Sequence, residues 1–171
     1  MLKLILVTCS VFICSFAIAQ DDTTAIKKNI RLCADSMATA FMTKDWKTFT
    51  RFTVPSLVEM LGGEDSFIVF TKEMLAEMPD SAIKEYTIRD VVQLVKTPGN
   101  WQAVVEQHLV FEADSMILNS TSYLVGISLD GGRAWSFLDP QGETGNARLL
   151  VPDLSPAIII PKTKDDLRNK E

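Results

Sequence analysis

Histidine is almost absent from this chain, which has a single imidazole, His108, in 171 residues. Transition-metal sites in proteins draw heavily on imidazole and thiolate ligands, so an imidazole-rich metal site cannot be assembled here. The sequence also lacks a glycine-rich phosphate loop, a paired CxxC, an HExxH helix, a nucleophile elbow and a calcium-binding loop. We therefore expect no metal and no cofactor, and no motif identifies a reaction.

Long apolar runs are confined to the N-terminus. Lys3 precedes an apolar stretch over residues 4–18 that ends in Ala17-Ile18-Ala19, a small-x-small cleavage sequence. We expect residues 1–19 to be a signal peptide and the mature chain to be secreted or periplasmic. No later stretch approaches the roughly 20 apolar residues that a membrane-spanning helix needs, so no membrane association is expected after cleavage.

Cysteine and positive charge are also scarce. Cys9 and Cys14 fall in the predicted signal peptide, and neither follows the small residue expected before a lipidated cysteine, which favours simple export. Cys33 is then the one remaining thiol and can form no internal disulfide. The formal net charge is −5 and the cationic residues are scattered, which argues against a nucleic-acid partner.

The segment after the predicted signal peptide has helical periodicity. Apolar side chains recur every three or four residues at Ile26, Ile30, Cys33, Met37 and Phe41. Cys33 belongs to this stripe, so we interpret it as a small buried hydrophobe rather than a reactive thiol.

Three shorter helical segments follow. Asp45 is predicted to cap the first, and Pro55 to open a second that ends at Gly62-Gly63. Residues 64–78 are predicted to form the third. The helices therefore precede any strand.

Residues 83–138 have the pattern of an antiparallel meander. Runs rich in Val, Ile, Leu and aromatic residues are separated by three turn sequences, Pro98-Gly99-Asn100, Ala113-Asp114-Ser115 and Asp130-Gly131-Gly132. Helices followed by an uninterrupted antiparallel sheet predict an α+β domain with the helices on one face of the sheet, and exclude a Rossmann-type fold. We expect one domain over residues 20–161, with residues 139–161 as an extended C-terminal strap and residues 162–171 as a charged flexible tail.

The first predicted hairpin fixes an expected register. If residues 96–100 form its loop, the facing pairs are Val95 with Trp101, Val91 with Val105, Arg89 with Gln107 and Ile88 with His108. Alternation along each strand then separates two faces. The first carries Val91, Val95, Trp101, Val105, Leu109 and Phe111, and the second carries Ile88, Asp90, Val92, Val104, Glu106, His108 and Val110.

The order of these segments is similar to that of a known family. The expected order is an amphipathic helix, Lys44-Asp45-Trp46 leading into short aromatic helical turns, Gly62-Gly63, a further helix and a meander that closes with residues 130–137. This order resembles that of the nuclear transport factor 2-like superfamily of cystatin-like α+β cones. The resemblance covers about residues 23–138. It implies a strongly curved four-stranded sheet wrapped around the helices, with a pocket between them. The superfamily includes isomerases, cyclases, dehydratases, ligand binders and dimerisation modules, so it selects no function, and its catalytic residues have no position-by-position match here.

Three titratable residues share the second predicted face. Asp90 lies opposite Glu106 in the expected register, and His108 follows two residues along the strand. Grouped acids beside an imidazole shift one another's pKa values, as acid–base chemistry on a small molecule requires. We favour a solvated or subunit-contacting surface as the interpretation of this face, with a catalytic cluster of His108, Asp90 and Glu106 as the alternative.

The next strand would add a polar floor to this face. If residues 113–114 form a two-residue loop, Asn119, Thr121 and Tyr123 lie opposite His108, Glu106 and Val104. A three-residue loop brings Ser120 and Ser122 alongside instead. Tyr123 and Asn119 are thus candidate ligand contacts.

The first face offers a second binding hypothesis. Arg89 in a mostly apolar cleft would hold a carboxylate, and Trp101 would stack on a small hydrophobic ligand. The ordinary roles are a snorkelling arginine and a core tryptophan, which we favour. We expect an exported small-molecule-binding or assembly domain. The alternatives are a cofactor-independent isomerase, cyclase or dehydratase, and a homodimerisation module. A homodimer is expected because both faces are partly apolar and one layer of helices covers one face.

Overall fold

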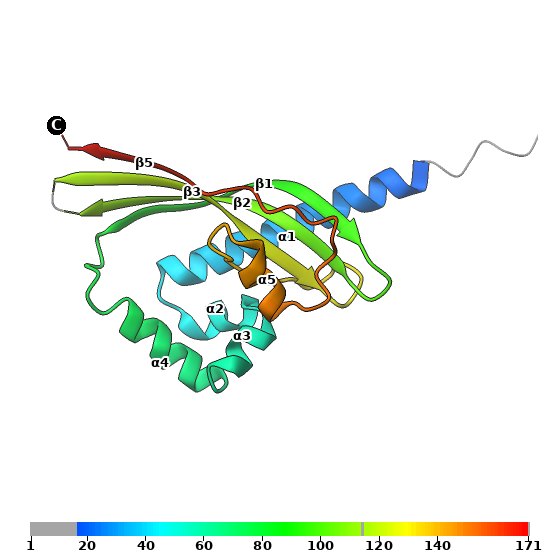
Figure 1. Cartoon of the computed structure of the whole chain (residues 1–171), viewed down its shortest axis with the longest axis horizontal. Coiled ribbons are helices and arrows are strands. Elements are labelled where there is room, and N and C mark those ends of the chain that lie inside the picture. The colour runs from blue at the N-terminus through cyan, green and yellow to red at the C-terminus, as the bar shows by residue number, and fades with distance from the viewer. Residues whose placement is uncertain (1–16, 114, 171) are drawn as a thin grey trace, which may run out of the picture.

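The computed structural model describes residues 17–113 and 115–170, and the side chains of the first helix from Thr23 onward. The predicted signal peptide lies almost entirely outside the described residues. The fold is α+β, as predicted, with four helices followed by an antiparallel sheet (Figure 1). The helices are α1 (Ala17–Met42), α2 (Trp46–Phe52), α3 (Pro55–Met60) and α4 (Glu64–Met74). The strands are β1 (Ile83–Lys96), β2 (Trp101–Ala113), β3 (Met116–Ser128) and β4 (Ser136–Leu138), and after them come α5 (Thr144–Leu150) and β5 (Lys164–Asn169).

Helix α1 lies across one face of the sheet, which we call the inner face. Its predicted apolar stripe is the buried side: Ile30 and Met37 have exposed fractions of 0% and 3%, and they pack with Val105 and Leu124 of the sheet. Cys33 is half-buried against the same core, and burial raises the pKa of its thiol. Its structural role is therefore as predicted. In the part of the chain that the structure describes, no helix combines the length and apolar character needed to cross a membrane.

The short helices begin where the sequence predicts, but α4 ends at Met74 rather than at the predicted residue 78. Asp45 accepts a hydrogen bond from the Thr48 N–H at 3.1 Å and caps α2. Pro55 occupies the first turn of α3. Gly62 and Gly63 have φ angles of 93° and 95°, which β-carbon-bearing residues rarely adopt, and they turn the chain from α3 into α4.

The sheet is ordered β1-β2-β3-β4, and β5 adds to β3 beside β4. The first hairpin register was predicted correctly only at Val91, which faces Val105. Val95 faces Gln102 rather than Trp101, and Ile88 faces Gln107 rather than His108. Val95 is offset because the turn is one residue shorter than expected, with Lys96 facing Trp101, and the other pairs are offset by register shifts on either side of Val91. Each bulge offsets the pairing by one residue, so residues of β1 change face relative to a regular strand.

The second hairpin pairs Ala113 with Met116, so its turn comes one residue later than the expected loop at 113–114, and every pairing is offset by two residues. The pairs are therefore Glu106 with Tyr123, His108 with Thr121, and Val110 with Asn119. An offset of two keeps each side chain on its predicted face and changes only its partner. The three-residue-loop alternative is excluded.

Part of the outer face of the sheet is covered by the C-terminal segment. Val104 and Val125 pack there with Leu154, Ile158 and other apolar residues of the chain after β4. Two glutamine side chains pair with the backbone of this segment as a neighbouring strand would. Gln102 donates to the Asp153 carbonyl at 3.0 Å and accepts from the Ser155 N–H at 2.7 Å, and Gln93 makes the same two bonds to Ile159.

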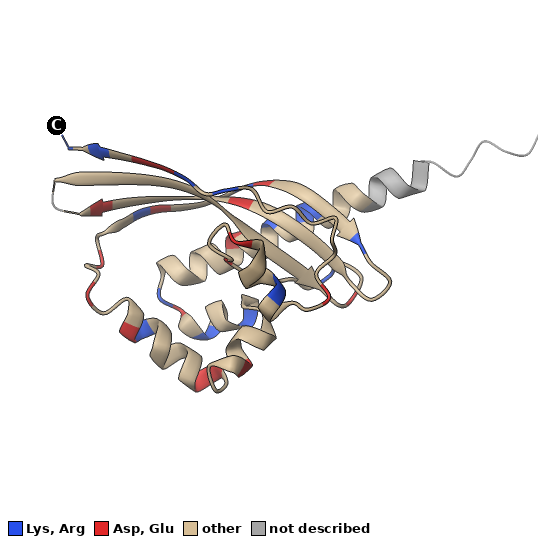
Figure 2. Cartoon of the chain, viewed as in Figure 1, with Lys and Arg blue, Asp and Glu red and all other residues tan. Residues whose placement is uncertain are grey.

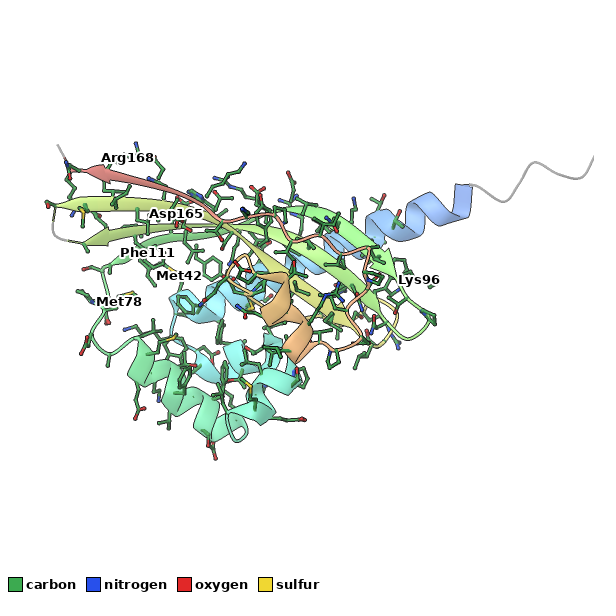
Figure 3. All side chains as sticks on the ribbon, in the orientation of Figure 1. Met42, Met78, Lys96, Phe111, Asp165 and Arg168 are labelled. Carbon is green, nitrogen blue, oxygen red and sulfur yellow. The ribbon has the colours of Figure 1, made fainter. Side chains whose placement is uncertain are left out.

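The expectation of a flexible tail over residues 162–171 is wrong for most of that stretch, because Lys164–Asn169 forms β5 and pairs with β3 from Met116 to Thr121. Every side chain of β5 is exposed, and the strand carries both signs of charge (Figure 2). Asp165 and Arg168 mark this strand at the far end of the sheet (Figure 3). The pairing with β3 satisfies the backbone of this segment, and a charged edge strand discourages pairing with another chain.

Candidate ligand-binding cavity

A cavity of about 250 Å³ lies between the inner face of the sheet and the helices. Its walls come from all four N-terminal helices and from β1, β3 and β4 with the residue after it. Phe70 and Met74 of α4 line it while remaining 46% and 61% exposed, so it opens to solvent beside α4. The apolar lining residues are Met37, Phe41, Phe49, Leu57, Leu61, Phe67, Phe70, Met74, Leu124, Phe137 and Leu138.

Two threonines in the wall add little polarity. The Thr53 hydroxyl donates to the Phe49 carbonyl at 3.1 Å, and the Thr71 hydroxyl donates to the Phe67 carbonyl at 2.8 Å. Because each hydroxyl is bonded within its own helical turn, the cavity is mostly apolar along its length.

One end of the cavity is polar, and each of four successive strand regions contributes a side chain to it. The Tyr86 hydroxyl on β1 donates to Gln107 Oε1 on β2 at 2.7 Å. Gln107 Nε2 donates both to Ser122 Oγ on β3, at 2.8 Å, and to Oδ2 of Asp139, just after β4, at 2.6 Å. Tyr86 and Asp139 line the cavity, whereas Gln107 is only 2% exposed and holds them together from behind.

The Asp139 side chain is fixed by the turn that it begins. Its Oδ1 accepts from the Gln141 N–H at 2.7 Å, and Gln141 has a φ of 56° followed by Gly142 at 75°. An aspartate that bonds the backbone two residues later stabilises such a turn. Strand β4, which precedes Asp139, packs closely on Gly126, since a β-carbon at Gly126 would lie 3.0 Å from the Phe137 ring.

The protonation of both lining groups is perturbed by their surroundings. Asp139 lines the cavity and is solvent-exposed, yet desolvation by the surrounding protein raises the pKa of its carboxyl, and hydrogen bonds from Gln141, Gln107 and Ser122 offset part of this rise. Burial, and secondarily the charge of Asp139, raise the pKa of the Tyr86 phenol. At neutral pH the phenol is protonated.

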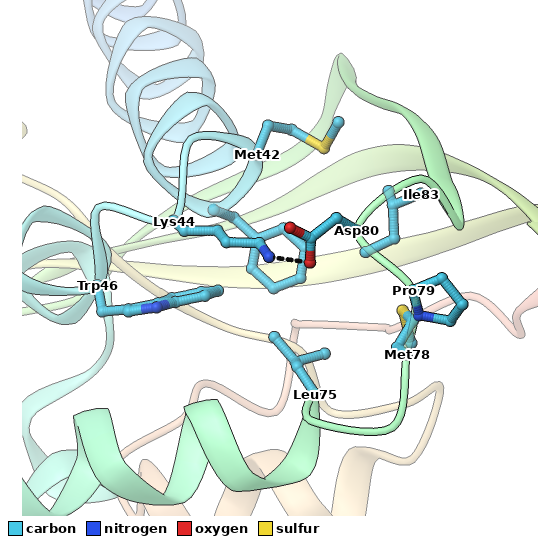
Figure 4. Close-up of a pocket in the computed structure, with 9 residues that line it drawn as sticks. Met42, Lys44, Trp46, Leu75, Met78, Pro79, Asp80 and Ile83 are labelled. Carbon is cyan, nitrogen blue, oxygen red and sulfur yellow. Dashed lines mark hydrogen bonds and ion pairs between the residues drawn. The ribbon is translucent and has the colours of Figure 1, made fainter.

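A second, smaller recess of about 50 Å³ adjoins the cavity and shares Phe41 with it. Trp46, Leu75, Met78 and Ile83 line it, and an ion pair between Lys44 and Asp80 crosses it (Figure 4). Both charged residues are largely exposed, so this pair belongs to the rim of the molecule.

The predicted acid–base cluster is divided by the structure. Glu106 and His108 lie on the outer face, away from the cavity, where His108 Nδ1 is 3.3 Å from Thr121 Oγ1. Asp90 falls in the irregular part of β1, and its carboxylate is 3.9 Å from Arg31 of α1 rather than opposite Glu106. The predicted pairing of Asp90 with Glu106 is therefore wrong, because the bulges of β1 displace Asp90.

The predicted ligand contacts lie outside the cavity lining. Arg89 is exposed and its guanidinium is 3.4 Å from Glu106, so it does not occupy an apolar cleft. Trp101 packs against the inner core, with Lys96 Nζ 5.3 Å from its ring centre. Tyr123 is buried in the outer core, and desolvation, with a smaller effect of neighbouring Glu106, raises the pKa of its phenol. Asn119 is paired to Asp166 of β5.

The sequence analysis missed Tyr86 and Asp139. Gln107 carried a signal that could have found them, because it is a polar residue among the apolar side chains of one predicted face, and buried amides need hydrogen-bond partners. Among residues 17–113 and 115–170, no group of three or more His, Cys, Asp or Glu side chains is placed to hold a metal ion.

Comparisons with protein-family models, with curated proteins and with solved structures find no match to this chain. The superfamily resemblance therefore stays a prediction, and function is inferred from the geometry of the cavity.

Proposed function

We propose that this chain is an exported, nuclear transport factor 2-like domain that binds a small, largely apolar molecule in the cavity between its helices and the inner face of the sheet. The observation that carries the proposal is the composition of the cavity, whose long wall is apolar and whose polar groups, Tyr86 and Asp139, converge at one end. Ligand sites typically combine an apolar concave surface with a few fixed polar groups.

Assembly through the sheet is less well supported than ligand binding. The expectation of a homodimer depended on an uncovered apolar outer face. Ile158 and Ile160, with exposed fractions of 2% and 7%, pack on that face together with other residues of the C-terminal segment. The C-terminal segment thus covers apolar side chains of the outer face within one chain, which weakens the reason for expecting a homodimer; the homodimer stays a prediction.

A second candidate is cofactor-independent acid–base catalysis in the same cavity. It is favoured by Asp139, because a carboxyl with a raised pKa in an apolar site is suited to proton transfer. Asp139 then takes the role that the sequence predicted for His108. Turnover that is lost in Asp139→Asn, with binding retained, distinguishes this candidate from simple binding.

The binding proposal is tested by filling the cavity. Thr71 lines it and is 4% exposed, whereas Val69, on the same helix α4, is 53% exposed and absent from the lining. We expect Thr71→Phe to lower the affinity for butylbenzene at least about tenfold, a loss of roughly 1.4 kcal/mol, because the new ring occupies ligand space. Val69→Phe is the matched control. Equal affinities in Thr71→Phe, Val69→Phe and the unmodified protein, measured by calorimetry, would contradict the proposal.

A further inference from the structure

The polar end of the cavity presents hydrogen-bond acceptors to a ligand. The Tyr86 proton is donated to Gln107 Oε1, and the two Nε2 protons of Gln107 are donated to Ser122 and Asp139. The Gln141 N–H is donated to Asp139 Oδ1. What remains for a ligand is the oxygen of Tyr86 and the free lone pairs of Asp139, all of which accept.

The orientation of the Gln107 amide is fixed by these partners. Rotating it by half a turn would place Oε1 against Asp139 Oδ2, so that two acceptors would face each other across 2.6 Å while the carboxylate is ionised. The observed orientation satisfies Tyr86, Ser122 and Asp139 at once. The orientation of the buried Gln107 amide thus leaves hydrogen-bond acceptors, rather than donors, facing a ligand.

The Asp139 carboxylate has no cationic partner among the described residues. The groups that stabilise its charge are the Gln141 N–H and the side chains of Gln107 and Ser122, all uncharged. The cavity lining contains no Lys, Arg or His. Arg89, which the sequence placed near such a site, is paired with Glu106 on the opposite face. A carboxylate without a counter-charge interacts favourably with a cation brought by a ligand and repels an anion.

Resting on the proposed function, we infer that the ligand is an apolar molecule with a protonated amine, bound with its ammonium group on Asp139 and its apolar body along the helices. The ammonium donates to Asp139, while Tyr86 offers a second acceptor beside it. A carboxylate ligand, which the sequence analysis considered, is disfavoured by its like charge.

The test uses four probes with the same body: phenylbutylamine, phenylbutanol, phenylbutyrate and butylbenzene. In calorimetry at neutral pH with the full chain, we expect the amine to bind at least about tenfold more tightly than the alcohol or the hydrocarbon, because charge-assisted hydrogen bonds are the stronger class. Phenylbutyrate should bind most weakly. Equal binding of amine and alcohol, or tighter binding of the acid, overturns the inference.

Two variants locate the effect. Asp139→Asn should bring the amine and the alcohol within about threefold of each other and leave butylbenzene affinity unchanged, which also shows that the cavity is still folded. Glu106→Gln, on the outer face, should keep the full preference for the amine. An amine preference that persists in Asp139→Asn overturns the inference. If none of the four probes binds, the proposed function itself fails, which is a different result from binding without a preference.

Discussion

The two faces of the sheet carry similar polar residues in very different surroundings. On the inner face, Tyr86, Gln107 and Asp139 are connected by short hydrogen bonds at the end of an apolar cavity. On the outer face, Glu106 is paired with an exposed arginine, and His108 and Thr121 lie half-buried beside it. Acid and partner groups are present on both faces. The neighbouring cavity and the connection through buried Gln107 make the inner set a candidate site, whereas Glu106 and His108 line neither of the cavities described above.

The largest expected difference between the faces is in stability. Gln107→Leu leaves Tyr86, Ser122 and Asp139 without their shared partner, and we expect it to lower the free energy of unfolding by about 3 kcal/mol. His108→Gln, one position along the same strand, should stay within about 0.5 kcal/mol of the unmodified protein. The free energy of unfolding of both variants is measured by urea denaturation. A larger loss in His108→Gln than in Gln107→Leu would reverse the comparison.

The two tyrosines provide a smaller contrast. Tyr86→Phe removes one hydrogen bond, from the hydroxyl to Gln107, and we expect a loss of about 1 kcal/mol in the free energy of unfolding together with weaker binding of phenylbutylamine. Tyr123→Phe acts on the outer core, so it should leave the affinity unchanged. Probe titration of both variants separates the faces, and equal effects on affinity would show that the cavity is not the binding site.

The smallest expected effect concerns pH. The pKa of Asp139 is raised in the native state, so the native protein binds this proton more tightly than the unfolded chain does. The associated stabilisation is present below the ordinary carboxyl value of 3.8 and is lost as pH rises through the raised native value. Asp139→Asn should therefore raise Tm at neutral pH, by no more than about 2–4 °C, and lose this advantage in acid.

Glu106→Gln is the matched control for the pH experiment. Its ion pair with Arg89 is partly exposed, and such pairs contribute little, so we expect a change in stability within about 1 kcal/mol. Thermal melts across the acid range compare the two variants. A Tm gain in Asp139→Asn that is the same at every pH would mean that the carboxylate charge is not its cause.

Much of the fold could be predicted from the sequence alone, because it depends on side-chain periodicity, helix caps and turn residues. The stripe through Ile30 and Met37 placed α1 on the sheet, Asp45 and Pro55 placed the starts of two helices, and the glycine-rich turns placed the meander. These features depend on residues near one another in the chain, through caps, turns and side-chain periodicity.

The tertiary structure decided which side chains meet. The bulges of β1 moved Asp90 away from Glu106 and turned Ile88 to the inner core, and the pairing of β5 with β3 ordered a charged segment that has no apolar stripe of its own. The cavity brings together Tyr86 and Asp139, which are far apart in sequence and meet through Gln107. A one-residue register shift changes a residue's face at little local cost, so such contacts are set by the packing of the whole domain rather than by any short stretch of sequence.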